Sequence, residues 1–196
     1  VQLIRNASPL PDDASIGVLF VGFLALAVVV MSAQRGRGAG DLSRFLFGSI
    51  TAVDNADLQT LVAAAFITVG GVVILHRALL VSTFDPIQAR LIGFRPQATH
   101  FALLVLLALS IVASFQTVGS LLVFAFLIAP PATASLFVTR VPVLMVGAVG
   151  IGSVSAVLGL LISFHHGTAT GATMALITVV AFVVGLAASH VMTLRR

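Results

Sequence analysis

Long uncharged runs constrain the fold of this chain more than any other feature. Five runs contain no Asp, Glu, Lys or Arg: residues 14–34, 58–75, 101–139, 141–164 and 167–189. A helix that crosses a bilayer needs about 20 apolar residues, so residues 101–139 are long enough for two crossings. Division at the polar segment 114–120 gives spans near residues 97–115 and 119–138. The sequence therefore predicts an all-α polytopic membrane helix bundle with six spans.

The composition supports a membrane protein. Hydrophobic residues make up 59% of the chain and charged residues only 8%, whereas soluble domains carry about 25% charged residues. A transmembrane β-barrel is not indicated, because the apolar runs are continuous and do not alternate. The basic residues are scattered at span edges and form no stripe for nucleic acid. The chain contains no Lys, so it cannot form a P-loop of its own.

The arginines predict the orientation of the spans. With six spans, one side of the membrane holds three arginines and the other seven. The minority side holds Arg35, Arg37 and Arg44, and the majority side holds Arg5, Arg77, Arg90, Arg95, Arg140, Arg195 and Arg196. The positive-inside rule makes the majority side cytoplasmic, so we expect a cytoplasmic C-terminus. The chain begins with Val and shows no basic region of a signal peptide, and we expect it to be truncated or processed at its N-terminus.

The segment "STFDPIQARLIGFRP" interrupts the apolar runs on the cytoplasmic side. Asp85 is suited to cap a helix that begins at Pro86, and Gln88 completes a pattern like a capping box. Gly93 is suited to end this helix. The sequence predicts a helix of about two turns over residues 86–92, too short to be stable alone in water.

The apolar residues of this short helix require a surface to pack against; they are Ile87, Ala89, Leu91 and Ile92. One interpretation is an ordinary loop that lies on the membrane surface. The other is a docking element for a cytoplasmic partner.

Five segments in register resemble one protein family. "FDPIQARLIG" resembles the Phe-Asp-Pro-x-x-Ala-x-x-x-Gly signature of permease subunits of zinc/manganese/iron ABC importers, and the matching residues are Phe84, Asp85, Pro86, Ala89 and Gly93. "DDASIGVLF", "FLFGSI", "TVGSLLVFAFLIAPPATA" and "SFHHGTATGAT" resemble further elements of the family in the same order. The resemblance covers nearly the whole chain.

The resemblance implies the architecture and the partners. Residues 1–196 would form a single permease domain of a type II ABC importer that lacks its N-terminal spans, in the inner membrane of a prokaryote. Residues 84–93 would be a coupling helix that fits a cleft in a separate ATPase subunit, where ATP binds. A second permease copy and a periplasmic or lipid-anchored metal-binding protein would complete the importer. The chain would transport zinc, manganese or iron, bind no cofactor itself and have no enzymatic site.

Two departures from the family pattern affect the site. Ile87 stands where the family often has an acid after the Pro, so a salt bridge there is in doubt. Residues 167–171 read Gly-Thr-Ala-Thr-Gly where the family commonly has Asp-x-Pro-x-Gly, so a carboxylate near the outer mouth is missing.

His165 and His166 are the candidate residues for an outer metal path, because zinc and manganese sites use His nitrogen and carboxylate oxygen. The alternative is a pair of histidines in a solvated turn or at the lipid headgroups. The other histidines are expected at interfaces; they are His76, His100 and His190. Three acids on the outer side could attract a divalent cation or contact a binding protein, or be ordinary solvated loop acids; they are Asp41, Asp54 and Asp57.

Three packing features complete the prediction. Pro130 and Pro131 lie inside a span and predict a kinked or broken helix. Residues 41–53 are too short to cross and are expected to form an outer interfacial helix. Small residues at helical spacing predict close helix packing in lipid; they are Ala148, Gly152, Ala156, Gly159 and Ser163.

Two alternative function classes remain open. An intramembrane serine protease would need a Ser in a Gly-x-Ser-Gly context, which the sequence lacks. A non-ABC membrane scaffold or a secondary transporter subunit would have the same hydropathy. A proton-driven transporter would usually carry an acid within a span, and none is present.

Overall fold

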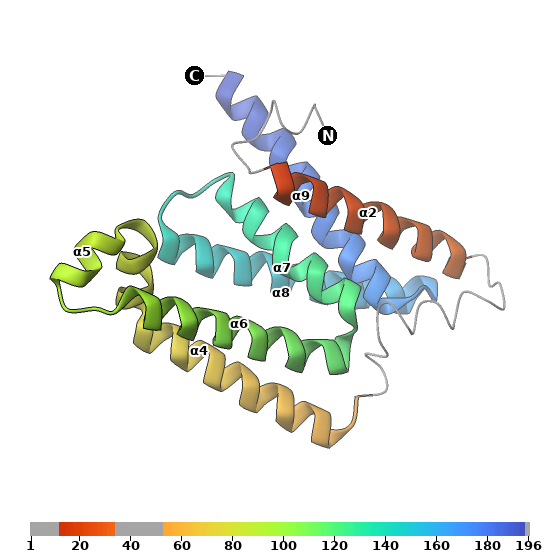
Figure 1. Cartoon of the computed structure of the whole chain (residues 1–196). Coiled ribbons are helices and arrows are strands. Elements are labelled where there is room, and N and C mark those ends of the chain that lie inside the picture. Colours follow the sequence, from red (N-terminus) through yellow and green to blue (C-terminus); the bar gives the residue numbers. More distant parts are fainter. Residues whose placement is uncertain (1–11, 34–52, 195–196) are drawn as a thin grey trace. The chain divides into compact units, whose positions relative to one another are not determined.

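The computed structural model describes residues 12–33 and 53–194, and all regular structure among these residues is α-helical (Figure 1). The helices in chain order are α2 (Asp12–Ala33), α4 (Asn55–Phe84), α5 (Pro86–Leu91), α6 (Pro96–Val118), α7 (Ser120–Ser135), α8 (Val141–His166) and α9 (Thr170–Leu194). The all-α prediction is confirmed for this part of the chain. The predicted interfacial helix at residues 41–53 lies almost wholly outside the described residues.

Four of the six predicted spans correspond to helices that are long and apolar enough to cross a membrane. They lie within α4, α6, α8 and α9. The two other apolar helices are α2, with 22 residues, and α7, with 16. The 16 residues of α7 rise about 24 Å at 1.5 Å per residue, which is less than the hydrocarbon core of about 30 Å. Among the described residues, α4, α6, α8 and α9 meet the expectation of a full-length span, the 22 residues of α2 rise about 33 Å, and α7 alone is shorter than the hydrocarbon core.

The boundary between α6 and α7 lies at Gly119, within the polar segment where the sequence predicted a division. Gly119 has a φ of 88° and interrupts the helix for a single residue. At the other end of α7 the helix continues through Pro130 and Pro131 and ends at Ser135. The prolines therefore do not break the helix, and the predicted kink stays a prediction.

One compact unit contains α2, α7, α8 and α9. Within it, α9 packs against each of the other three helices. Phe182 of α9 is completely buried, in a cluster with Val18 of α2 and with Ala129 and Ala132 of α7. A second cluster joins the same three helices and includes Ala25, Leu122 and Ala175. The side chains of α9 thus form the centre of this unit.

Small residues bring α8 and α9 close together in this unit. A Cβ atom added to Gly159 would lie 2.5 Å from the Cα atom of Met174, so only glycine permits this approach. Gly152, Gly159 and Ser163 are buried, and Ser155 joins them on the same face. The predicted small-residue stripe is confirmed at Gly152, Gly159 and Ser163. Its other two members, Ala148 and Ala156, are only partly buried.

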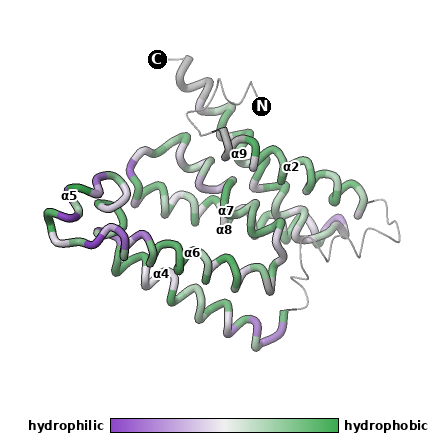
Figure 2. Tube along the Cα trace, in the orientation of Figure 1, coloured by the Kyte–Doolittle hydropathy of each residue, from purple (hydrophilic) through white to green (hydrophobic). Residues whose placement is uncertain are grey.

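The other compact unit contains α4, α5 and α6. Helix α4 contacts α5, and Gly71 of α4 faces the side chain of Leu106 of α6. Most of the large apolar side chains of α4 remain exposed within the chain, among them Phe66, Val73 and Ile74. Figure 2 shows hydrophilic residues concentrated at the beginning of α4 and around α5, with apolar helix between them. This distribution is that of two membrane-spanning helices joined by a polar connection.

Candidate functional site

The beginning of α5 is fixed by Asp85. Its Oδ1 atom accepts hydrogen bonds from the backbone N–H groups of Ile87, at 3.0 Å, and Gln88, at 2.9 Å. Pro86 occupies the first turn, where the missing N–H removes no helical hydrogen bond. The predicted N-cap is therefore confirmed.

The capping-box part of the prediction is wrong. A capping box requires the side chain at the third helical position to accept from the backbone N–H of the capping residue. The N–H of Asp85 instead donates to the carbonyl of Val81 at 2.9 Å, because α4 continues to Phe84 without a loop. The N–H of Asp85 is therefore not available to the side chain of Gln88.

The end of α5 is a Schellman motif. The N–H of Phe94 donates to the carbonyl of Ala89 at 2.9 Å, and the N–H of Gly93 donates to that of Arg90 at 3.1 Å. Gly93 has a φ of 92°, which an L-residue with a side chain rarely adopts. The helix ends at Leu91, one residue earlier than predicted, because Ile92 already serves as the C-cap.

One face of α5 is covered and the other is bare. Ala89 is completely buried. Phe84, Ile87 and Leu91 are 72%, 73% and 83% exposed, and Ile92 is also exposed. This free apolar surface fits both interpretations of the segment, burial in the membrane surface and contact with a partner.

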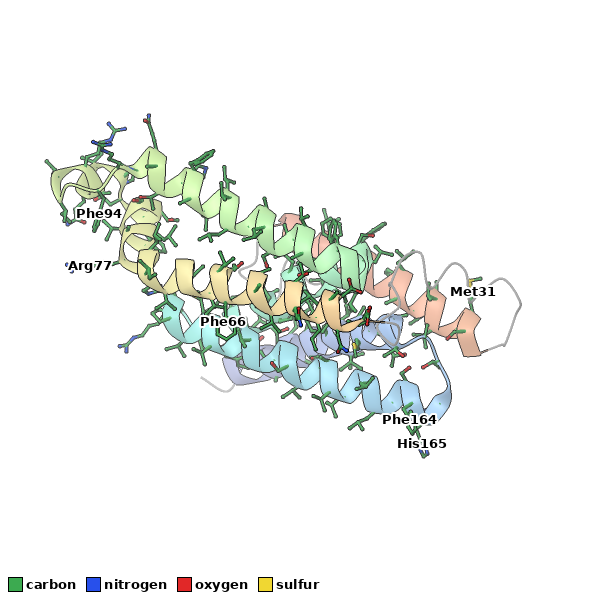
Figure 3. All side chains as sticks on the ribbon, turned by 90° about the horizontal axis from the view of Figure 1, so that it is seen from below. Met31, Phe66, Arg77, Phe94, Phe164 and His165 are labelled. Carbon is green, nitrogen blue, oxygen red and sulfur yellow. The ribbon has the colours of Figure 1, made fainter. Side chains whose placement is uncertain are left out.

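A pocket of about 620 Å³ adjoins α5 where the chain turns into α6. The residues that line it are Arg90, Gly93, Phe94, Arg95, Pro96, Gln97 and Ala98. Figure 3 shows Phe94 at this end of the unit, beyond Arg77 of α4. In the sequence alone, these arginines indicate only the orientation of the spans. The spacing of two Arg around a helix-ending Gly was the signal that could have identified the pocket.

His165 and His166 lie in the last turn of α8 and are exposed. Joint binding of one ion by both histidines would need a loop, and the alternative interpretation also placed them in a turn. Helix α8 instead continues through both, and Gly167 is its left-handed C-cap with a φ of 64°. The two rings are edge-on, with centroids 5.7 Å apart. Nδ1 of His166 lies 3.2 Å from the carbonyl oxygen of Ile162. Figure 3 shows Phe164 and His165 projecting away from this end of α8.

A group of hydroxyl side chains behind the histidines was missed by the sequence analysis. The hydroxyl of the buried Ser163 donates to the carbonyl of Thr168 at 2.6 Å and lies 3.0 Å from Oγ1 of Thr170. The N–H of Ala169 donates to Oγ of Ser32 at 3.1 Å and so joins the turn to α2. These bonds fix the turn between α8 and α9. The recurrence of Ser and Thr in "SFHHGTATGAT" was the sequence signal that could have indicated this group of hydroxyl side chains.

The remaining predicted acids have structural roles or lie outside the described residues. Asp54 caps α4 by accepting from the N–H of Asn55 at 2.7 Å, and Asp57 completes a capping box. Asp41 lies outside the described residues. In the described part of the chain, no three His, Cys, Asp or Glu side chains are grouped so as to hold a metal ion.

The chain is similar to transport proteins along most of its length. The ABC 3 transport family matches residues 1–189. The manganese transport system membrane protein MntC of Halalkalibacterium halodurans is 38% identical over 177 residues, which are 90% of this chain and 60% of MntC. The chelated iron transport system membrane protein YfeD of Yersinia pestis is 38% identical over 189 residues, 96% of this chain and 63% of YfeD.

A solved structure has the same fold. A chain of PsaBC from Streptococcus pneumoniae, in complex with Fab, superposes with a TM-score of 0.67 at 30% identity, covering 91% of this chain and 64% of that one. The chain thus spans about three-fifths of the length of these relatives. Its family match and the four long apolar helices among its described residues identify a multi-pass membrane protein. The chain belongs to the ABC 3 transport family.

Proposed function

We propose that this chain is the membrane-spanning part of a permease subunit in an ATP-driven importer of divalent transition-metal ions. The family match supports the transport class, and relatives named for manganese and chelated iron transport support a metal substrate. Manganese, iron and zinc are the candidate ions. Manganese is the first to test because MntC and the manganese import permease ScaB of Streptococcus parasanguinis are among the relatives.

The observation that carries this proposal is α5. It is a short helix with a fixed beginning and end and a bare apolar face. In the proposed importer, α5 and Phe84 fit a cleft of a separate ATPase subunit and transmit its movement to the spans. ATP binds on that subunit, because a chain without Lys cannot form a P-loop.

The proposal includes the rest of the assembly. Six spans, of which α7 is the shortest, cross the inner membrane of a prokaryote and place the C-terminus in the cytoplasm. Two permease copies surround the path, as in a type II importer. A periplasmic or lipid-anchored binding protein delivers the metal. His165 and His166 lie on the outer side and guide the ion toward the path.

Uptake of radioactive manganese by vesicles tests the proposal. The vesicles contain the permease with its ATPase, and the binding protein is supplied outside. Uptake that requires ATP and the ATPase supports the importer, and competition by zinc and iron ranks the metals. Uptake driven by a proton gradient without ATP would indicate a secondary transporter. No uptake under either condition, with an intact complex, would indicate a scaffold.

A further inference from the structure

The pocket beside α5 has an unbalanced positive charge. Arg90 and Arg95 line it, and none of its lining residues is acidic. Among the described residues of this unit the acids are Asp54, Asp57 and Asp85. Asp54 and Asp57 lie at the other end of the 30-residue α4, roughly 40 Å away along the helix axis and far beyond a Debye length of about 8 Å.

Asp85 is close in sequence but is already engaged. Its Oδ1 atom accepts two backbone hydrogen bonds at the beginning of α5. Neither Arg90 nor Arg95 forms an ion pair with Asp85 or with another carboxylate in the described part of this unit. They remain hydrated while α5 is uncovered, since both arginines are exposed.

A partner that covers α5 changes the solvation free energy of Arg90 and Arg95. Arg90 lies on α5 itself, beside the exposed Leu91, and the pocket opens at the end of the same helix. A partner that covers both the apolar face and the adjoining pocket removes water from the two guanidinium groups. A guanidinium group that loses water without a partner is costly, and an arginine fork matches a carboxylate with two parallel hydrogen bonds.

We propose that the pocket receives the carboxylate of an Asp or Glu of the ATPase subunit when that subunit covers α5. This proposal rests on the proposed function and adds the chemistry of the contact, which is an apolar centre with a charged pair at one edge. An anionic lipid headgroup offers similar chemistry. Lipid-binding segments, however, carry clusters of four to eight basic residues, whereas two arginines line this pocket.

The test is the affinity of the purified permease for its ATPase at low and at high salt. The variants are Arg90→Gln, Arg95→Gln and their combination. Arg77→Gln is the matched control, because Arg77 is an exposed arginine in the same unit and does not line the pocket. We expect the double variant to bind at least roughly tenfold more weakly and to lose most of the salt dependence, while Arg77→Gln changes neither. Arg95→Lys keeps the charge but loses the fork, and should be intermediate.

Each contrary outcome has a distinct meaning. If the double variant binds like the parent while Phe84→Ala binds weakly, the pocket proposal is wrong and the proposed function stands. An equal loss in Arg77→Gln would show a general charge effect and would also overturn the pocket. If the double variant loses binding to phosphatidylglycerol vesicles but not to the ATPase, the ligand is lipid. A parent permease that binds no ATPase would overturn both proposals.

Discussion

The Oδ1 atom of Asp85 accepts a hydrogen bond from the backbone N–H of Gln88 at 2.9 Å. The same carboxylate accepts from the N–H of Ile87, and the N–H of Asp85 donates back to Val81 in α4. A single residue therefore ends the 30-residue α4 and begins α5. This connection has no loop to absorb movement, so displacement of α5 acts directly on the end of α4.

Replacing Asp85 should loosen α5. Asp85→Ala removes both accepted hydrogen bonds, and loss of such a cap costs about 1 kcal/mol. The amides of the α5 turn should exchange with solvent several-fold faster, and ATPase binding should weaken mildly. Hydrogen exchange measured by mass spectrometry checks the first effect. Asp85→Asn is the control, because Asn also caps helices; if it behaves like the Ala variant, the charge and not the cap is responsible.

Gly93 should be intolerant of a side chain for conformational reasons alone. Its φ is 92°, and a Cβ atom added there would meet no heavy atom within 4 Å. Left-handed backbone costs an L-residue about 1–2 kcal/mol, so Gly93→Ala should destabilise the turn and lower the affinity for the ATPase.

The matched control for that change is Gly70→Ala. Gly70 has equally open surroundings but lies inside α4. Alanine in a helix interior is favoured over glycine by roughly 0.5–1 kcal/mol, so this variant should be at least as stable as the parent. Thermal unfolding in detergent measures both variants, and equal Tm values for the two would contradict the assignment.

Gly159→Ala should destabilise the unit that contains α8 and α9. The new Cβ would lie 2.5 Å from Cα of Met174 and 2.9 Å from its backbone nitrogen, which a rotamer change cannot relieve. Overpacking of this kind costs about 1–3 kcal/mol, measurable as a lower Tm. Gly150→Ala, on the same helix with nothing within 4 Å, is the control. A similar Tm for both variants would indicate that the helices can separate freely.

Replacing His165 and His166 together with Ala should weaken metal uptake at limiting metal and leave assembly intact. Both side chains are exposed at the end of α8, and imidazole is a ligand for manganese, iron and zinc. Uptake by vesicles at low and at saturating metal separates affinity from capacity. Phe164→Ala, an exposed neighbour without a ligand atom, is the control. Unchanged uptake at limiting metal would indicate that the histidines are solvated residues without a role in metal uptake.

Much of the fold followed from local signals. Uncharged runs predicted the helices, and Asp85, Pro86 and Gly93 predicted the position of α5, because caps and turn glycines act within a few residues. The capping box at Gln88 failed because the sequence does not reveal that α4 continues to Phe84 and already uses the N–H of Asp85. The same limit placed His165 and His166 in a turn in the alternative interpretation, although Gly167 was the helix-ending residue.

Features that depend on contacts across the chain were not predictable. The bond from the N–H of Ala169 to Ser32 joins residues 137 apart in sequence, and local patterns carry no information on it. The pocket at Arg90 and Arg95 is different, because its lining residues all lie between residues 90 and 98 and follow from the local Schellman turn at Gly93.

Phe84→Ala is the change that tests the central claim most directly, since Phe84 is 72% exposed at the junction of α4 and α5. Aromatic residues dominate interfaces, and truncation of such an anchor costs about 2 kcal/mol or more. The measurement is a pull-down of the ATPase by purified permease, with metal uptake by vesicles of the same variants. Phe66→Ala is the control, because it removes an equally exposed ring from the middle of α4. We predict that Phe84→Ala inserts normally, binds the ATPase at least roughly 30-fold more weakly and transports less metal, while Phe66→Ala retains binding. Parental binding and transport by Phe84→Ala would contradict the assignment of α5 as the coupling helix.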